Sequence, residues 1–124
     1  MELAVFGAHL RGQPLTHQLT GRGARFLRAT ETSADYRMVA LPTIPPKPGL
    51  QRVTEDGHRL ACEVWRLSPA ALGSFLAELP SPMSLGAVTL ADGSTVVGFG
   101  CEASAAEGAP DITGYGGWVA YLGS

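Results

Sequence analysis

The segment Leu3-Ala-Val-Phe-Gly-Ala-His-Leu-Arg-Gly12 constrains the fold of this chain most strongly. Its first four residues are apolar without interruption, which predicts a short, buried strand at the centre of a sheet. Gly7 follows directly, so the strand ends where the backbone comes close to another group. The loop from Gly7 to Gly12 can direct successive N–H groups at an anion. The alternative is that both glycines only permit a turn, with His9 as an ordinary core or surface residue.

Length and composition indicate one globular domain spanning residues 1–124. The chain is 45% hydrophobic and 16% charged, and its net charge of −2 provides no basic surface for nucleic acid or an anionic membrane. No apolar run reaches the roughly 18 residues that a membrane span needs. Glu2 and the lack of a basic N-terminal segment argue against a signal peptide, so we expect a cytoplasmic protein.

The cysteines indicate neither a disulfide framework nor a metal site. Cys62 and Cys101 both lie in apolar, strand-like segments, where a free thiol behaves as a small hydrophobic group. Neither has a second cysteine or a histidine at metal-ligand spacing, and no phosphate-binding loop or zinc motif occurs. We therefore expect a reducing compartment, no metal and no cofactor.

Alternating apolar residues and turn signals predict about seven short strands and two or three helices. A hairpin is expected from 24–30 and 35–41, a strand pair from 51–54 and 60–67, and a second hairpin from 85–90 and 94–102, closed by Asp92-Gly93. Helices are expected at 13–19, at 69–79 with Ser68 as the N-cap, and at 118–122. Mostly adjacent antiparallel pairs with flanking helices predict an α+β fold with a small mixed, mostly antiparallel β-barrel.

Two charged residues outside the first loop are candidates for chemistry. Lys47, the only lysine, lies in the proline-rich segment 42–50, which we expect to be a stiff loop that presents it, or else a rigid connector with a solvated amine. Glu63 shares a strand face with Trp65. If it is buried there, its pKa would rise and it could act as a general acid or base; alternatively it pairs with an arginine at a strand edge.

Several stretches occur in an order that resembles the C-terminal domain of allophanate hydrolase. They are Phe-Gly-Ala-His-Leu-Arg-Gly-Gln-Pro-Leu (6–15), His-Gln-Leu-Thr (17–20), Asp-Tyr-Arg (35–37), Pro-Pro-Lys-Pro-Gly-Leu (45–50), Glu-Val-Trp (63–65), Val-Thr-Leu-Ala-Asp-Gly (88–93) and Asp-Ile-Thr…Gly-Gly-Trp (111–118). Together they span nearly the whole chain. The resemblance implies a gamma-glutamyl cyclotransferase-like fold, in which the loop after the first strand binds a carboxylate through backbone N–H groups. Gly7, Ala8, His9 and Leu10 occupy that loop here.

The resemblance also implies a function. We expect a stand-alone relative that binds a small carboxylated carbamate or urea-type ligand and assists decarboxylation of N-carboxycarbamate in urea and allophanate degradation. The candidate roles are His9 as proton donor, Glu63 as a group that holds His9 or the nitrogen of the ligand, Tyr36 as an orienting group and Lys47 as positive charge. No amidase domain is contained in these residues, so the amidase step would need a partner.

Two further functions stay open at this point. The first is a non-catalytic interaction or ligand-binding module that docks on an amidase or forms a homodimer, with Trp118 and Tyr121 as anchors. The second is a gamma-glutamyl cyclotransferase, since that family uses a glutamate shortly after its main helix and Glu78 lies near this position. Whether the chain is an enzyme is therefore left open by its sequence.

Overall fold

The computed structural model describes residues 1–124 and contains a five-stranded sheet and a separate two-stranded sheet. The strands are β1 (Glu2–Val5), β2 (Arg25–Glu31), β3 (Tyr36–Leu41), β4 (Lys47–Arg52), β5 (Ala61–Arg66), β6 (Met83–Thr89) and β7 (Thr95–Cys101). The helices are α1 (His17–Thr20), α2 (Pro69–Ala77), α3 (Ala103–Ala106) and α4 (Trp118–Leu122), with a 3-10 turn, η1, at Thr113–Tyr115.

The first strand lies at the centre of the larger sheet, as its apolar sequence predicted. The strand order is β2-β5-β1-β7-β6, with β1 antiparallel to β5 and parallel to β7. Leu3, Ala4 and Val5 are completely buried. A strand with neighbours on both edges and cover on both faces needs an unbroken apolar run, which explains the opening sequence.

The two-stranded sheet corrects two of the predicted pairings. β2 pairs with β5 rather than with β3, and β3 pairs with β4, so residues 24–41 form no hairpin and β4 and β5 form no pair. The short linkers between these strands suggested local pairing, but the chain crosses to the other sheet at each of them. Residues 47–50 were expected in a loop and are instead strand. Pro48 is tolerated there because β4 is an edge strand.

The hairpin of β6 and β7 is confirmed, and its turn shows why. The Asp92 carboxylate accepts hydrogen bonds from the Ser94 backbone N–H at 2.9 Å and from its hydroxyl at 2.6 Å. Gly93 adopts a φ of 87°, which a glycine does without strain. The turn residues therefore fix the register that places Val88 opposite Val96.

Helix α2 begins where its N-cap predicted, but its apolar stripe is narrower than expected. The Ser68 side chain accepts a hydrogen bond from the Ala71 N–H at 3.1 Å. Leu72 and Phe75 are buried, whereas Leu76 is 52% exposed. The helix therefore packs through one short line of side chains. The first helix is shorter than predicted and begins at His17 rather than at residue 13, and α4 is confirmed.

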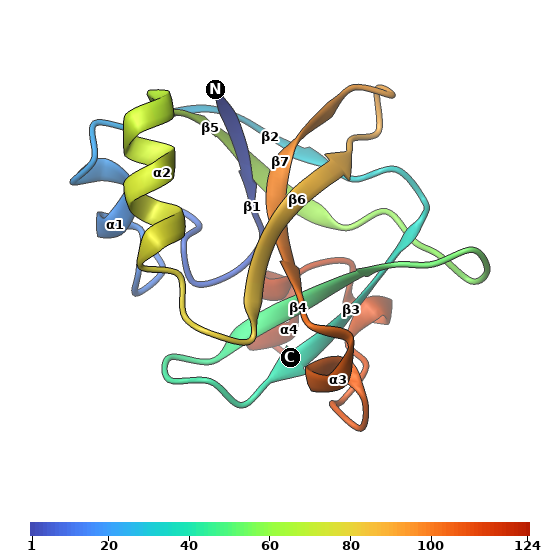
Figure 1. Ribbon diagram of the computed structural model, residues 1–124. Coiled ribbons are helices and arrows are strands. Elements are labelled where there is room, and N and C mark those ends of the chain that lie inside the picture. Colours follow the sequence, from blue (N-terminus) through green and yellow to red (C-terminus); the bar gives the residue numbers. More distant parts are fainter.

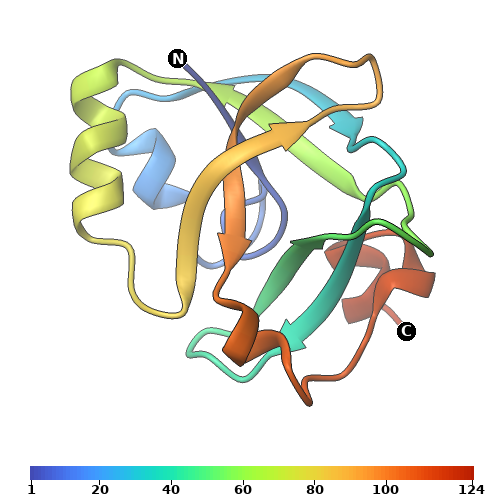
Figure 2. The same ribbon diagram turned by 45° about the vertical axis from the view of Figure 1, so that its right-hand side comes forward.

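The predicted small β-barrel is not supported by the structure, although the α+β class is right. The edge strands β2 and β6 do not pair, and only an isolated bridge between Thr32 and Leu90, just beyond their ends, connects the two edges, so the five-stranded sheet stays open. In both views α1 and α2 lie on one side of this sheet, while β3 and β4 cross its lower end near α3 and α4 (Figures 1 and 2). β1 thus ends between α2 and β4, and the loop after it is enclosed by both.

None of the helices has the length and apolar composition that crossing a bilayer requires.

Candidate functional site

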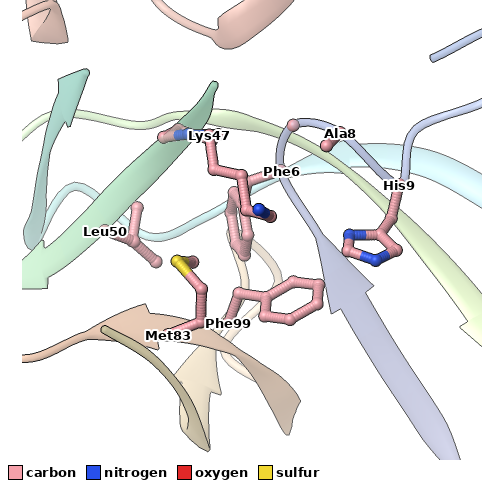
Figure 3. A pocket seen from close by; sticks show the side chains of 9 residues that line it. Phe6, Ala8, His9, Lys47, Leu50, Met83 and Phe99 are labelled. Atoms are coloured by element: carbon pink, nitrogen blue, oxygen red, sulfur yellow. The ribbon is translucent and has the colours of Figure 1, made fainter. Parts of the chain in front are cut away.

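A small cavity lies where the loop after β1 meets β4, β6 and β7 (Figure 3). Its volume is about 10 Å³, enough for one water molecule. The lining combines the loop residues Gly7, Ala8 and His9, the strand residues Lys47, Pro48 and Leu50, and the apolar side chains of Phe6, Met83 and Phe99. The structure therefore brings four of the seven predicted site residues together.

A larger cleft of about 190 Å³ adjoins this cavity and shares two of its residues, His9 and Lys47. Its other walls come from α1, from the loop before β4 and from the C-terminal end of α2, where Glu78 lies. A ligand of several heavy atoms fits the cleft but not the inner cavity. Such a ligand would meet the His9 ring and the Lys47 side chain at the boundary between the two spaces.

His9 is held by three neighbours that the first-loop sequence does not contain. Its Nε2 lies 2.8 Å from the Gln18 side-chain oxygen. Its ring stacks on Phe99 at 5.0 Å between centroids and meets Phe75 edge-on at 5.2 Å. The residue is only 3% exposed, so the ring has one orientation in an aromatic setting.

This setting fixes the protonation state of His9. Burial lowers the pKa of the imidazole, the Gln18 hydrogen bond raises it, and the nearby positive charge of Lys47 lowers it, with a net pKa below 6.5. The ring is therefore neutral at pH 7. Because an amide oxygen can only accept, Nε2 carries the hydrogen, and Nδ1 is a lone-pair acceptor with no hydrogen bond inside the chain.

Lys47 is a buried cation without an anionic partner. The residue is 5% exposed, and its Nζ donates one long hydrogen bond, 3.3 Å, to the Pro45 carbonyl. None of the four salt bridges of the chain involves it. Burial lowers the pKa of its amine. A charge in this state is unfavourable unless something else neutralises it, which makes the site receptive to an anion.

The loop after β1 adds unpaired donors to this positive charge. The Leu10 N–H donates to the Gly7 carbonyl at 3.0 Å, and the Leu15 N–H donates to the Ala8 carbonyl at 2.8 Å, which fixes the loop. The N–H groups of Gly7, Ala8 and His9 donate to no acceptor in the chain. Three successive free N–H groups beside a lysine are suited to a carboxylate. Figure 3 shows Lys47 reaching from β4 toward this loop.

Three predicted site residues lie elsewhere. Leu10 belongs to the main hydrophobic core and is 6% exposed. The Tyr36 hydroxyl accepts hydrogen bonds from Arg52 at 2.7 Å and from the Thr89 N–H at 2.9 Å, so it ties β3 to β6 and does not face His9. Tyr36 lines neither the inner cavity nor the cleft, so its position gives no support to an orienting role there, and that role stays a prediction.

Glu63 does not support His9, which corrects its predicted role. Its carboxylate accepts from the Arg11 backbone N–H at 2.9 Å, from the Arg11 Nε at 3.0 Å and from the Trp65 indole at 3.2 Å. The second interpretation, a strand carboxylate paired with an arginine, is the one that the structure bears out. Glu63 thereby holds the far end of the loop that carries His9.

The residues that hold His9 were missed because no local pattern marks them. Gln18, Phe75 and Phe99 come from three segments that only the tertiary fold brings together. Glu78, the cyclotransferase candidate, lines the cleft, but its side chain is largely exposed and its carboxylate pairs with Arg22. The structure contains no group of three histidine, cysteine or acidic residues that could hold a metal ion.

Comparison with known proteins gives a consistent result. The family model of the allophanate hydrolase C-terminal domain matches residues 1–123. The urea amidolyase of Saccharomyces cerevisiae is 42% identical over 127 residues, which cover 98% of this chain. The chain spans only 7% of that relative's length.

Solved structures show the same relationship. An allophanate hydrolase structure from Kluyveromyces lactis matches with a TM-score of 0.93 and 39% identity, over 98% of this chain and 21% of that one. A uropathogenic E. coli-specific protein matches with a TM-score of 0.92 and 35% identity, over 98% of this chain and 94% of that one. An aig2-like protein from Mus musculus, with a TM-score of 0.66 and 19% identity over 89% of this chain and 84% of that one, shares the fold alone.

Proposed function

The chain belongs to the allophanate hydrolase C-terminal domain family, and on this basis we propose that it binds a small carboxylated carbamate and assists its decarboxylation. The ligand class is that of N-carboxycarbamate, a compact dianion with two carboxylates on one nitrogen. Relatives named urea amidolyase and allophanate hydrolase contain this domain within much longer chains, which supports a place in urea breakdown beside an amidase.

The observation that carries this proposal is the buried amine of Lys47, which has no anionic partner. It provides a positive charge beside the free N–H groups of the Gly7–His9 segment and at the edge of the cleft. A carboxylate that binds there gains a cation and donors in an environment with little water, where electrostatic interactions are strong. No other cation of the chain combines burial with the lack of an acidic neighbour.

The reaction requires a proton at the nitrogen of the ligand. The bond between this nitrogen and the departing carboxyl carbon breaks, and its electron pair stays on nitrogen. Nitrogen takes up one proton, so the dianion and the proton give carbon dioxide and a carbamate monoanion. A donor placed near the nitrogen lowers the barrier, because it neutralises charge as that charge develops.

His9 is the proposed donor, but only once the ligand is bound. In the free protein its ring is neutral, since burial and Lys47 hold its pKa below 6.5. A dianion at Lys47 reverses the local charge and raises the pKa of His9, which then gains a proton on Nδ1. Loss of one negative charge as carbon dioxide leaves makes the product a weaker ligand, which favours its release.

Binding can be tested with malonate, in which a methylene group replaces the nitrogen of N-carboxycarbamate. Calorimetry should detect malonate binding that weakens with salt, while malonamide, which has the same shape without charge, should not bind. The proposal would be contradicted if malonate and malonamide bound with equal affinity, or if neither bound. Turnover is tested separately by supplying N-carboxycarbamate from an amidase domain, because the compound is short-lived.

A docking role is the second candidate, and the C-terminal segment favours it. Tyr115, Val119 and Leu122 are each about half exposed, and a groove of about 520 Å³ lies between α4, α3 and β3. Such a surface suits an amidase-type partner. Association with an amidase domain, without any effect of malonate or of His9→Ala, would favour this function over ligand chemistry.

A further inference from the structure

Lys47 has a further chemical property that anion binding does not use. Its amine makes one long hydrogen bond, and the residue lines the inner cavity together with the side chains of Phe6, Met83 and Phe99. A lysine that is buried among apolar groups and lacks an anion is driven toward its neutral form, whose nitrogen lone pair is nucleophilic. It is also the only lysine in the sequence.

We propose that Lys47 is a site of reversible carboxylation, where its ε-amine captures carbon dioxide as a carbamate and thereby reverses the charge of the site. This inference goes beyond the proposed function. The capture needs only dissolved carbon dioxide, and it holds whether or not the protein decarboxylates a ligand.

The carboxylation of Lys47 needs a nucleophile and a proton acceptor, and both are residues that line the cavity. The Nζ lone pair attacks the carbon of carbon dioxide, a nitrogen–carbon bond forms, and one carbon–oxygen electron pair moves onto oxygen. The nitrogen then loses a proton. His9 lines the same cavity, and its Nδ1 is free to accept that proton and pass it to water in the cleft.

The surroundings also suit the anionic product. The unpaired N–H groups of Gly7, Ala8 and His9 are available to its carboxylate. Glu78 is the one acidic residue lining the cleft, and its carboxylate is already paired with Arg22. The inner cavity holds only about one water molecule, so the carbamate would extend into the cleft of about 190 Å³.

Carboxylation would make the site sensitive to carbon dioxide. A carbamate at Lys47 replaces a cation by an anion, so carboxylate ligands lose their counter-charge and are repelled. If the proposed function also holds, the gaseous product would inhibit its own formation. This last consequence rests on the proposed function, whereas the modification itself does not.

The modification can be trapped and located. The protein is incubated with isotope-labelled bicarbonate at mildly alkaline pH, treated with triethyloxonium to convert carbamates into stable ethyl esters, and mapped by mass spectrometry. We expect the trapped ester at Lys47, at several-fold higher occupancy than in a peptide of residues 42–52. The α-amine of Met1 provides an internal reference, and Lys47→Arg should lose the ε-adduct while keeping the one at Met1.

A second readout uses malonate affinity. Lys47→Arg keeps the positive charge of the site, and each protein is compared with its own malonate affinity in the absence of carbon dioxide. Rising carbon dioxide at constant ionic strength should weaken binding to the native protein by a larger factor than binding to Lys47→Arg, whereas simple competition by bicarbonate would weaken both by the same factor. Circular dichroism establishes that the variant is folded. Occupancy at Lys47 no higher than in the peptide, in a protein whose Met1 α-amine is labelled, would overturn the proposal. Failure of the decarboxylation assay would leave this result unchanged, so the two proposals can fail separately.

Discussion

Gly7 and Pro48 pack so closely that a β-carbon on Gly7 would overlap the ring of Pro48. This contact joins the loop after β1 to β4, and it holds Lys47 beside the free N–H groups of the loop. The glycine is needed for space rather than for an unusual backbone conformation, because its φ is not in the left-handed region. The predicted close approach of the backbone at Gly7 is therefore confirmed.

Gly7→Ala should disrupt both stability and ligand binding. The added methyl group must displace the ring of Pro48 in β4, so we expect a loss of about 1–3 kcal/mol in the free energy of unfolding and of malonate binding. Gly73→Ala is the matched control, because nothing lies within 4 Å of its β-carbon position on α2. That change should stabilise the helix by about 1 kcal/mol with binding unchanged. Denaturant unfolding and calorimetry measure both, and equal effects of the two variants would contradict the packing argument.

Lys47→Met should stabilise the protein while abolishing malonate binding. The pKa of Lys47 is lowered in the folded chain, so below its ordinary value the charged amine opposes folding, and an apolar side chain of similar length removes that penalty. We expect a gain on the order of 1 kcal/mol, measured by thermal unfolding at neutral pH. A variant less stable than the native protein would show that the ammonium is already well compensated in the folded state.

His9 should make stability depend on pH. Its folded pKa lies below the ordinary value of 6.5, so as pH falls below that value the unfolded chain binds the proton first and stability decreases. The slope from one such group is at most about 1.4 kcal/mol per pH unit. His17 and His58 are exposed and unchanged in His9→Gln, which should show a shallower loss between neutral and mildly acidic pH. Identical slopes for both proteins would mean that His9 titrates normally.

Neither thiol should react in the native protein. Burial raises the pKa of Cys62 to about 12 and also raises that of Cys101, and both residues are less than a tenth exposed. A thiol reagent such as Ellman's should therefore label the folded chain slowly. In denaturant it should label both cysteines at once. Rapid labelling of one thiol under native conditions would reveal local opening of β5 or β7.

The sequence identified those features that depend on neighbouring residues. The central strand at Leu3–Val5, the Ser68 cap and the Asp92-Gly93 turn each rest on a few adjacent side chains, and all three are confirmed. The family was also identified correctly from ordered motifs. Two of the predicted strand pairings were wrong, because β2 pairs with β5, which is distant in the sequence, and β3 pairs with the following strand β4 instead of with β2. Linker length does not reveal either partner.

The residues of the candidate site also separate into those that a local sequence pattern predicted and those that it did not. Gly7, Ala8 and His9 share one loop, and the structure places Lys47 beside them because Pro48 packs on Gly7. Glu63 was predicted to support His9 because it is an acidic residue on an apolar strand. Its partner is instead Arg11, and Gln18 takes the position at His9. Which side chains meet across the fold depends on how α1 and β5 lie around the loop, and the strand pattern alone does not contain that information.

The central claim is that the His9–Lys47 site assists decarboxylation, and carbon dioxide release tests it most directly. An amidase-only fragment of an allophanate hydrolase is supplied with allophanate, and release is followed with and without this protein. The account predicts acceleration by the native chain and by Gly73→Ala, and about a hundredfold loss of that acceleration in His9→Ala. Release that never exceeds the spontaneous rate, or acceleration that His9→Ala and Lys47→Met retain in full, would contradict the account.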